Sequence, residues 1–516
     1  MQSQLSTSVK TGSLTVAARN ATNPPSRARH QAVPCNFRHR QLAMILSGFL
    51  LALPLAAEVT ALTGATVIDG NGGTPIRDGV IVIADAKISA VGTRSSVSIP
   101  TRARRIDVAG KFIMPGLMDA NVHLVPWPSW SYIEFLARYE NNFEGLIEEA
   151  AQIGLKHGFT TVFDSMGPLL PLMHVRDRIA KGEIEGSRMF VAGDIVGFRA
   201  VFTTPESMKS ASHAFQSRIN ALFELNVGPD LPWKSPAQVK EEMRKYVALG
   251  PDFVKYGATG DGRPVNSEVG QEAVLRFTPE QQRAMVEAVH EAGKIIQTHQ
   301  TSAESLRSVL DAGVDMAQHC SITGPSRISD ATIQLMIDRK FYCGTQWEVL
   351  SDEQLQDRKF FGSDAGNGNG KVNYAYENEL RMLKAGVPML LSTDAGIVDP
   401  DVAKDGGEGA ANQLGDSEFE MMHAMQQRGM TPMMILQAST RNIAAAYHKL
   451  DRMGTLEPGK FADLLVLDAD PLQSYRNMRK LFLVMKEGKV IDTGKLPHHP
   501  IVTSPEATNP GPVRLK

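Results

Sequence analysis

Side chains that can bind metal ions stand at the ends of five short apolar stretches of this sequence. They are Asn121 and His123 in the first stretch, then Lys255, His299, His319 and Asp394. Asn121 and His123 are two residues apart, so both point to the same side of a β-strand. A single histidine in a strand is usually a core residue, but several at strand ends together with the aspartate of "STDAG" indicate a metal site.

The stretches that carry these residues belong to a longer alternating pattern. Eight apolar runs between "KFIMPGLMDANVH" and "PMLLSTDAG" have the length and composition of strands, and helical patterns such as "TPEQQRAMVEAVHEAGK" separate them. Eight repeats of strand and helix predict an α/β chain with a (β/α)8 TIM barrel over residues 116–449. In such a barrel the carboxyl ends of the strands share one face, so the six side chains would converge there.

The regions on either side of the predicted barrel have a different character. Residues 58–115 and 450–495 contain short alternating strands separated by Gly and Asp turns, as in "DGVIVIADAKISAVG" and "LFLVMKEGKVIDTG". We expect both segments to form one small β-sandwich domain built from the two ends of the mature chain. Residues 496–516 then form a C-terminal tail.

The first 57 residues have the composition of a leader. They contain six basic residues and no acidic one, and a basic patch, an apolar run and small residues follow one another within residues 38–57. This order predicts a disordered segment and a signal peptide with cleavage after Ala57, and hence an exported, periplasmic or secreted protein without stable membrane association after cleavage. An uncleaved membrane anchor and a start at Met44 remain alternatives.

Charge and cysteine content limit the possible partners. Without the leader, 48 basic residues face 56 acidic ones, so the body is acidic and nucleic acid is not an expected partner. We expect a small-molecule substrate and a homo-oligomer. Only Cys320 and Cys343 lie in the mature part. We expect two free core thiols, with a contact between neighbouring strands as the alternative.

The sequence resembles the amidohydrolase superfamily, in particular its imidazolonepropionase-like and prolidase-like branch of metal-dependent hydrolases, which includes ochratoxinase-like enzymes. The resemblance covers residues 58–495. It is carried by "GKFIMPGLMDANVHL", "FVKYGATG", "IIQTHQTSAES", "DMAQHC", "LLSTDAG" and "GTLEPGKFADLLVLDADP".

This resemblance implies roles for the strand-end residues. Lys255 would be carbamylated by CO2 and would act as a carboxylate ligand that bridges the two ion sites. One or two divalent ions per chain are expected, with zinc as the expected metal. His299 and His319 would bind one ion, and His123 and Asp394 the other. A metal-bound hydroxide would attack an amide carbonyl, with Asp394 as the general base and then the general acid.

Asn121 departs from the family pattern, which has a histidine at this position. An amide oxygen is a weaker zinc ligand than an imidazole nitrogen. Three outcomes stay open: a labile first ion bound through Asn121, an enzyme that works with one ion, or a protein that has lost catalysis. A working hydrolase is favoured because every other ligand position is intact.

The substrate is less well defined by the sequence. Trp127, Trp130 and Trp347 follow predicted strands and are candidates for an aromatic-lined pocket, together with Tyr256 and Arg199, although the tryptophans could instead pin loops. We expect hydrolysis of an amide C–N bond in a dipeptide-like or N-acyl amino acid substrate. The alternatives are cyclic amide hydrolysis, deamination and a binding protein without catalysis. Lys255 weighs against the deaminases.

Overall fold

The computed structural model describes residues 59–125, 132–197, 212–223, 230–259, 275–324, 326–361, 374–399 and 413–503. The predicted leader and signal peptide therefore lie outside the described residues, as do Trp127, Trp130 and Arg199. Within these ranges, no helix has the length and apolar character that a membrane crossing requires.

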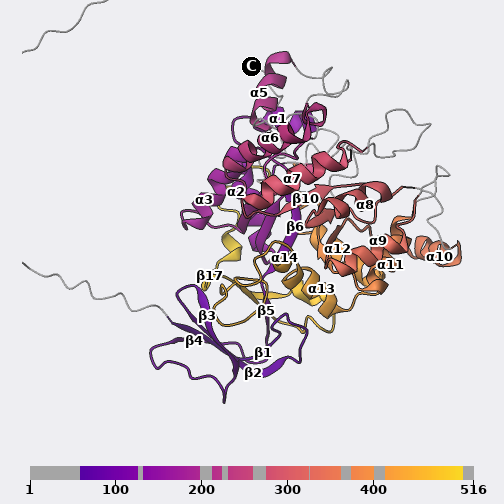
Figure 1. The fold of residues 1–516 in the computed structure, drawn as a ribbon. Coiled ribbons are helices and arrows are strands. Elements are labelled where there is room, and N and C mark those ends of the chain that lie inside the picture. Colours follow the sequence, from indigo (N-terminus) through magenta and orange to yellow (C-terminus); the bar gives the residue numbers. More distant parts are fainter. Residues whose placement is uncertain are drawn as a thin grey trace, which may run out of the picture. The chain divides into compact units, whose positions relative to one another are not determined.

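One β-sheet combines strands from both ends of the described chain (Figure 1). Its order is β17-β16-β15-β5-β1-β2-β3, with β4 paired to β1. The strands are β1 Thr60–Val67, β2 Ile76–Ala84, β3 Lys87–Thr93, β4 Arg104–Asp107, β5 Phe112–Pro115, β15 Leu464–Leu467, β16 Leu481–Lys486 and β17 Lys489–Ile491. The antiparallel pair β5–β15 joins the two ends, and Leu62, Ile113 and Leu464 lie in the buried apolar cluster of this sheet. The sandwich arrangement itself stays a prediction.

The middle of the chain alternates strands and helices, as the sequence predicts. The strands form two sheets, of order β14-β6-β7-β8 and β13-β12-β11-β10-β9, and every pair within them is parallel. Their bounds are β6 Leu117–His123, β7 Phe159–Asp164, β8 Arg188–Val191, β9 Val254–Gly257, β10 Ile296–His299, β11 Met316–Gln318, β12 Tyr342–Thr345, β13 Met389–Leu391 and β14 Ala395–Gly396. The α/β class is confirmed, and each of the eight predicted runs contains a strand.

Two further links connect these sheets. A parallel bridge pairs Val196, beyond the end of β8, with Tyr256 of β9. On the other side, the Asp394 backbone N–H donates to the Asn121 carbonyl at 2.8 Å, just before β14 pairs with β6. Both links lie near the carboxyl ends of the strands, where the candidate metal ligands stand.

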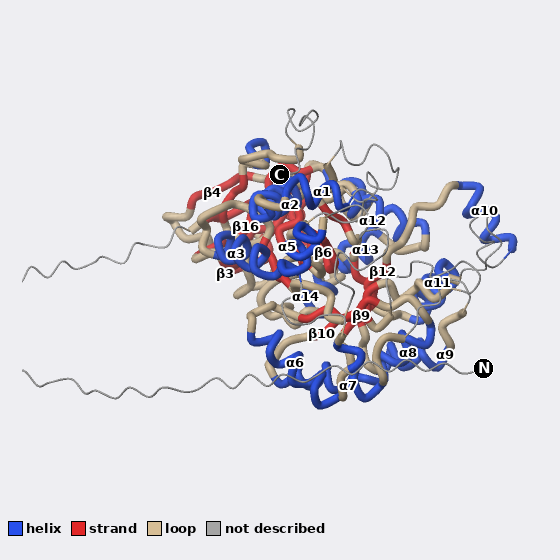
Figure 2. The backbone as a smooth tube through the Cα atoms, turned by 90° about the horizontal axis from the view of Figure 1, so that it is seen from above, coloured by secondary structure: helices blue, strands red, loops and turns tan. Residues whose placement is uncertain are grey.

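Helices follow most of the strands, and Figure 2 shows α6, α7 and α8 outward of β9 and β10. The helices are α1 Tyr132–Tyr139, α2 Phe143–Lys156, α3 Leu169–Ala180, α5 His213–Phe223, α6 Pro236–Ala248, α7 Pro279–Glu291, α8 Ala303–Ala312, α9 Asp330–Asp338, α10 Asp352–Phe361, α11 Ala375–Ala385, α12 Ser417–Gln427, α13 Pro432–Ala438 and α14 Arg441–Ala446. Short 3-10 turns occupy Leu231–Trp233, Tyr475–Arg479 and Thr493–Lys495.

Local capping signals explain several helix ends. Helix α7 begins with a capping box between Thr278 and Gln281 and with proline in its first turn. Helix α8 also begins with a capping box, formed between Ser302 and Ser305. Both of these side chains are hydroxyls, and the closing contact is made by Ser305 in place of an acidic side chain.

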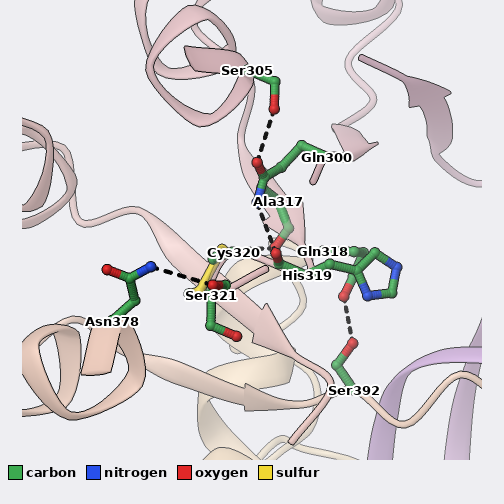
Figure 3. The surroundings of a disulfide bond; sticks show 10 residues. Gln300, Ser305, Ala317, Gln318, His319, Cys320, Ser321, Asn378 and Ser392 are labelled. Atoms are coloured by element: carbon green, nitrogen blue, oxygen red, sulfur yellow. Dashed lines mark hydrogen bonds between the residues drawn. A yellow bond between two sulfur atoms is a disulfide. The ribbon is translucent and has the colours of Figure 1, made fainter. Parts of the chain in front are cut away.

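Cys320 and Cys343 are joined by a disulfide bond, so the expectation of two free thiols is wrong (Figure 3). Strand β11 runs parallel to β12, with Ala317 opposite Cys343. His319 has a left-handed backbone with φ of +59° and turns the chain back, so that the Cys320 N–H bonds the Gly344 carbonyl. The Cα atoms of Cys320 and Cys343 then lie 5.9 Å apart, a normal disulfide spacing.

Candidate active site

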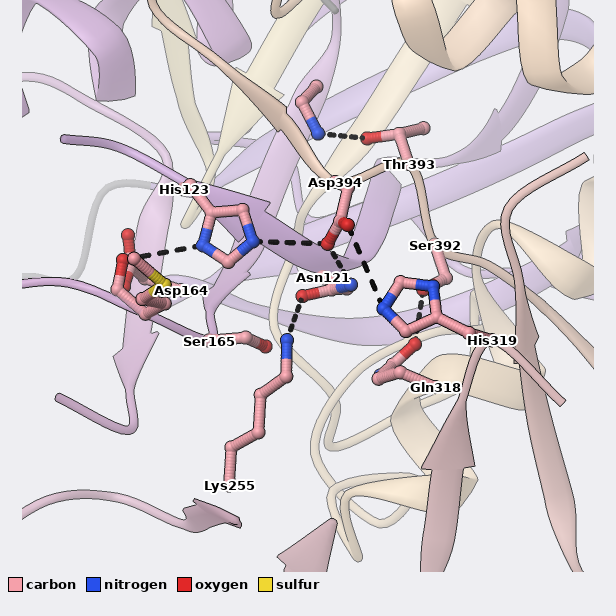
Figure 4. A network of polar contacts seen from close by, with 12 residues as sticks. Asn121, His123, Asp164, Ser165, Lys255, Gln318, His319, Ser392, Thr393 and Asp394 are labelled. Atoms are coloured by element: carbon pink, nitrogen blue, oxygen red, sulfur yellow. Dashed lines mark hydrogen bonds and ion pairs between the residues drawn. The ribbon is translucent and has the colours of Figure 1, made fainter. Parts of the chain in front are cut away.

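The carboxylate of Asp394 is the centre of the candidate site (Figure 4). His123 Nε2 lies 3.0 Å from Asp394 Oδ1, and His319 Nε2 lies 3.7 Å from Asp394 Oδ2. The His299 and His319 rings are neighbours, with centroids 4.8 Å apart. Residues that are distant in the sequence therefore meet at one point, as their strand-end positions predict.

Asn121 lies between the lysine and the aspartate of this site. Its Nδ2 donates to Asp394 Oδ1 at 2.5 Å, and its Oδ1 accepts from Lys255 Nζ at 3.1 Å (Figure 4). Lys255 projects from β9 and the other two side chains from β6 and the segment between β13 and β14. The residue that departs from the family pattern thus occupies a central position in the hydrogen-bond network.

Burial controls the protonation of these groups. Lys255, His319 and His123 are almost completely buried, and Asn121 is fully buried. Burial lowers the pKa of His319 to about 4 and lowers the pKa of Lys255 below its usual range. Burial opposes ionisation of Asp394, but the imidazoles and Lys255 outweigh it and hold the Asp394 pKa well below the ordinary value.

The donor chemistry of this set fits a divalent cation. Metal binding requires a neutral imidazole and an ionised carboxylate, and these are the forms favoured at His319 and Asp394. Across the described ranges, histidine, cysteine, aspartate and glutamate side chains alone form no group of three arranged to hold an ion. In the present arrangement His123 and Asn121 hydrogen-bond Asp394 directly.

Two of the candidate ligands have strained backbones. His319 and Asp394 both have a φ of +59°, in the left-handed region that non-glycine residues seldom adopt. Each directly follows the end of a strand or lies within three residues of it. Such strain persists only where the surroundings hold it in place, and it is concentrated at functional sites.

Asp119 is a buried residue of β6 that helps to hold one of these strained positions. Its Oδ1 accepts from the Asn121 N–H at 2.9 Å and from the Thr393 N–H at 3.3 Å, and its Oδ2 accepts from the Thr393 hydroxyl. Burial raises the Asp119 pKa to about 7 despite these donors. Asp119 is not among the residues predicted from the sequence, although its position two residues before Asn121 places both on the same side of β6.

A second set of buried polar side chains links several strands. Gln297 of β10 donates to Ser165 at 2.7 Å and accepts from Gln318 of β11 at 2.7 Å. The Tyr447 hydroxyl donates to the Ala120 carbonyl at 2.6 Å and lies 3.1 Å from Gln297 Oε1. These bonds connect strands from both sheets and satisfy polar groups that would be costly to bury alone.

The predicted substrate-binding residues that the structure describes do not gather around Asp394 as the candidate metal ligands do. The Tyr256 hydroxyl donates to Gln282 of helix α7 at 2.9 Å, on the opposite side of β9 from Lys255, which does not favour a substrate contact. Trp347 is buried after β12, where the Arg428 guanidinium lies 5.5 Å from its ring centroid. Trp127, Trp130 and Arg199 fall outside the described residues.

Comparisons with known proteins agree with this geometry. The model of the amidohydrolase family matches residues 112–493. The structure of molinate hydrolase is 36% identical with a TM-score of 0.78, covering 87% of this chain and 97% of that one. Phenylurea hydrolase B is 31% identical, also with a TM-score of 0.78, over 87% of this chain and all of that one. Ochratoxinase from Aspergillus niger is 23% identical over 90% of this chain and 91% of its own length.

Proposed function

Since the chain belongs to the amidohydrolase family and is a hydrolase of carbon–nitrogen bonds, we propose that it cleaves an amide-type C–N bond with the help of one or two divalent ions. The observation that carries this proposal is the convergence of His123, His319 and Lys255 on Asp394. These residues stand at the ends of different strands, and hydrolytic metal sites are commonly assembled in this way.

The proposal includes the closed barrel. The two parallel sheets would form one (β/α)8 barrel, joined by the Val196–Tyr256 bridge and by the contact of Asp394 with Asn121. The candidate site then lies at the carboxyl ends of the strands. The strands of residues 58–115 and 450–495 would form the accompanying β-sandwich domain.

Each candidate ligand has a defined place in the proposed metal centre. His299 and His319 would hold one ion, and His123, Asp394 and the Asn121 oxygen would hold the other. A bound ion, with zinc expected, would polarise the substrate carbonyl and assist the ionisation of a water molecule. The lowered pKa values of His319 and Asp394, which favour a neutral imidazole and an ionised carboxylate, support this assignment.

Lys255 would complete the centre as a carbamate. Its neutral amine adds to CO2, forms an N–C bond and releases one proton, which converts a neutral amine into an anionic carbamate whose oxygens can bind a cation. Complete burial lowers the Lys255 pKa and so favours the neutral amine that this addition needs. A protonated lysine could not bind a cation.

Asp394 would move the proton. Its carboxylate is held ionised, and it is positioned by contacts with His123 and Asn121. It would accept a proton from the attacking water and pass it to the leaving nitrogen. The strained left-handed backbone at Asp394 is consistent with a position fixed for this purpose.

Asn121 would weaken one ion site without removing it. Its neutral oxygen is a poorer zinc ligand than imidazole, while His123 and Asp394 remain beside it. We therefore expect Asn121→His to bind the first ion more tightly and to keep or raise hydrolysis at low zinc. If the native enzyme works with one ion and uses Asn121 to contact substrate, the same change would inhibit it.

The substrate class is proposed in two forms. The first is an N-acyl amino acid or dipeptide-like amide, in keeping with the likeness to ochratoxinase and to a Xaa-Pro dipeptidase. The second is an N-substituted urea, which the greater identity to phenylurea hydrolase B favours. A panel with one N-acyl aromatic amino acid, one Xaa-Pro dipeptide and one phenylurea separates these classes by kcat/KM.

The test uses the full chain depleted of metal by a chelator and then supplied with zinc. Hydrolysis of at least one panel compound should disappear on depletion and return with zinc. The variant Lys255→Ala should retain no metal and show no turnover, since the proposed carbamate on Lys255 would bind both ions. Full turnover by Lys255→Ala would refute the carbamate, and hydrolysis that is indifferent to chelation would refute the metal-dependent reaction.

Export and assembly are proposed separately. The leader composition supports secretion, and the recovered protein should begin near Glu58 and lie outside the cytoplasm. An intact N-terminus in the soluble cytoplasmic fraction would contradict this. We also propose a homo-oligomer, for which light scattering should give a mass of at least two chains.

A further inference from the structure

Gln300 is a fully buried residue that directly follows the candidate ligand His299 at the end of β10. Its Nε2 donates to the backbone carbonyl of His319 at 2.8 Å (Figure 3). One side chain therefore ties the strand end that carries one candidate ligand to the residue that supplies the other. His319 is also one of the two ligands with a left-handed backbone, which needs outside support.

The orientation of the Gln300 amide is determined by its partners. A backbone carbonyl can only accept, so the amide nitrogen must face His319. The amide oxygen accepts a hydrogen bond from the Ser305 hydroxyl at 2.9 Å (Figure 3). Ser305 is itself fully buried and belongs to the capping box at the start of α8. The helix start thus holds the amide, and the amide holds the ligand backbone.

We infer that Gln300, oriented by Ser305, is a positioning residue that sets the relative placement of His299 and His319 for metal binding. The inference rests on the proposed function, because it concerns the two residues that would hold one of the ions. Gln300 is not a candidate ligand, since its nitrogen and oxygen are directed at His319 and Ser305. Capping of α8 does not explain the Gln300 bond, because the box between Ser302 and Ser305 closes without it.

Three variants separate positioning from simple packing. Gln300→Met keeps the size of the side chain and removes the donor. Gln300→Glu keeps the shape and places an acceptor against the His319 carbonyl. The matched control is Gln152→Met in α2, because Gln152 is also buried and donates to a backbone carbonyl, that of Glu185, at 3.1 Å. The control thus removes the same kind of bond far from the candidate ligands in the chain.

The measurement is zinc affinity by chelator competition, with the absorption spectrum of the cobalt-loaded protein as a second readout. Both Gln300 variants should bind zinc about 10–100-fold more weakly and change the cobalt spectrum, as is usual when a residue that orients a ligand is lost. Gln152→Met should match the wild type in both readouts, even if thermal unfolding of the metal-free forms shows that it loses as much stability as Gln300→Met.

The possible outcomes are distinct. Wild-type affinity and spectrum in both Gln300 variants would overturn the inference and leave the proposed function intact. A wild-type protein that retains no divalent ion would overturn both. If Gln300→Met does not fold, Ser305→Ala decides the question, with Ser329→Ala of α9 as a helix-capping control. The inference is supported if Ser305→Ala binds zinc more weakly than the wild type while Ser329→Ala does not. It is overturned if Ser305→Ala and Ser329→Ala bind zinc equally well.

Discussion

Thr393→Val tests how the proposed proton carrier is held. Thr393 precedes Asp394 in the chain, and its hydroxyl donates to the buried Asp119 while its oxygen accepts from the Ala395 N–H at 3.1 Å. Valine has almost the same shape but makes neither bond. Asp119 would keep its two backbone donors and lose the third.

The expected loss of stability follows from these bonds. A hydrogen bond to an ionisable buried group contributes about 1.5–3 kcal/mol and a neutral one about 1 kcal/mol, so the change should cost about 2.5–4 kcal/mol. Unfolding entropy of about 2.1 cal/mol/K per residue, taken over residues 59–503, converts this to a Tm lowered by about 3–4 °C. Because the left-handed Asp394 loses its adjacent support, kcat should fall about 10–100-fold.

The assay pairs thermal unfolding with turnover. Thr440→Val is the matched control, since Thr440 is also fully buried and its hydroxyl donates to the Leu436 carbonyl at 2.6 Å. The control should lower the Tm and leave kcat unchanged, and Thr393→Ser should restore most of the activity. Wild-type kcat in Thr393→Val, or an equal loss in Thr440→Val, would refute this account of Asp394.

Three other properties follow from the structure. Arg428→Met should cost about 3–5 kcal/mol of stability, because it removes the guanidinium that lies 2.7 Å from the buried carboxylate of Glu379. Adding Glu379→Met should recover most of this loss, and a double variant that is as unstable as Arg428→Met in thermal melts would contradict the prediction. Reducing the Cys320–Cys343 bond, whose residues are separated by 23 positions, should cost about 3 kcal/mol, and a melt unchanged by reductant would argue against the disulfide. Burial lowers the His157 pKa, so between the lowered pKa and the ordinary value of 6.5 the unfolded chain binds more protons than the folded one. The free energy of unfolding should therefore rise with pH until about pH 6.5, and His157→Gln should flatten this rise in thermal melts from about pH 5 to about pH 8. A steeper rise in His157→Gln would contradict this prediction.

The sequence predicted the strands and the convergence of their terminal residues, because both depend on a repeating local pattern. His123, His319 and Asp394 come together since parallel strands end on the same side. The side-chain alternation of a strand also places Tyr256 on the opposite side of β9 from its neighbour Lys255, which the prediction of Tyr256 as a substrate-binding residue left out.

Other features depend on contacts that no local pattern contains. The Cys320–Cys343 bond requires the parallel register of β11 and β12 and the left-handed turn at His319. The roles of Asp119 and Gln300 arise from hydrogen bonds to residues distant in the sequence. Polar residues of this kind look ordinary in a sequence, because their partners are known only once the strands are assembled.

The metal content of the purified full chain, measured by elemental analysis alongside hydrolysis as zinc is titrated, tests the central claim most directly. We expect more than one divalent ion per chain at saturation, with the second bound more weakly because Asn121 supplies an amide oxygen in place of imidazole. Turnover should rise with occupancy. A protein that retains no metal after growth with zinc, or that hydrolyses its substrate at full rate when metal-free, would contradict the account.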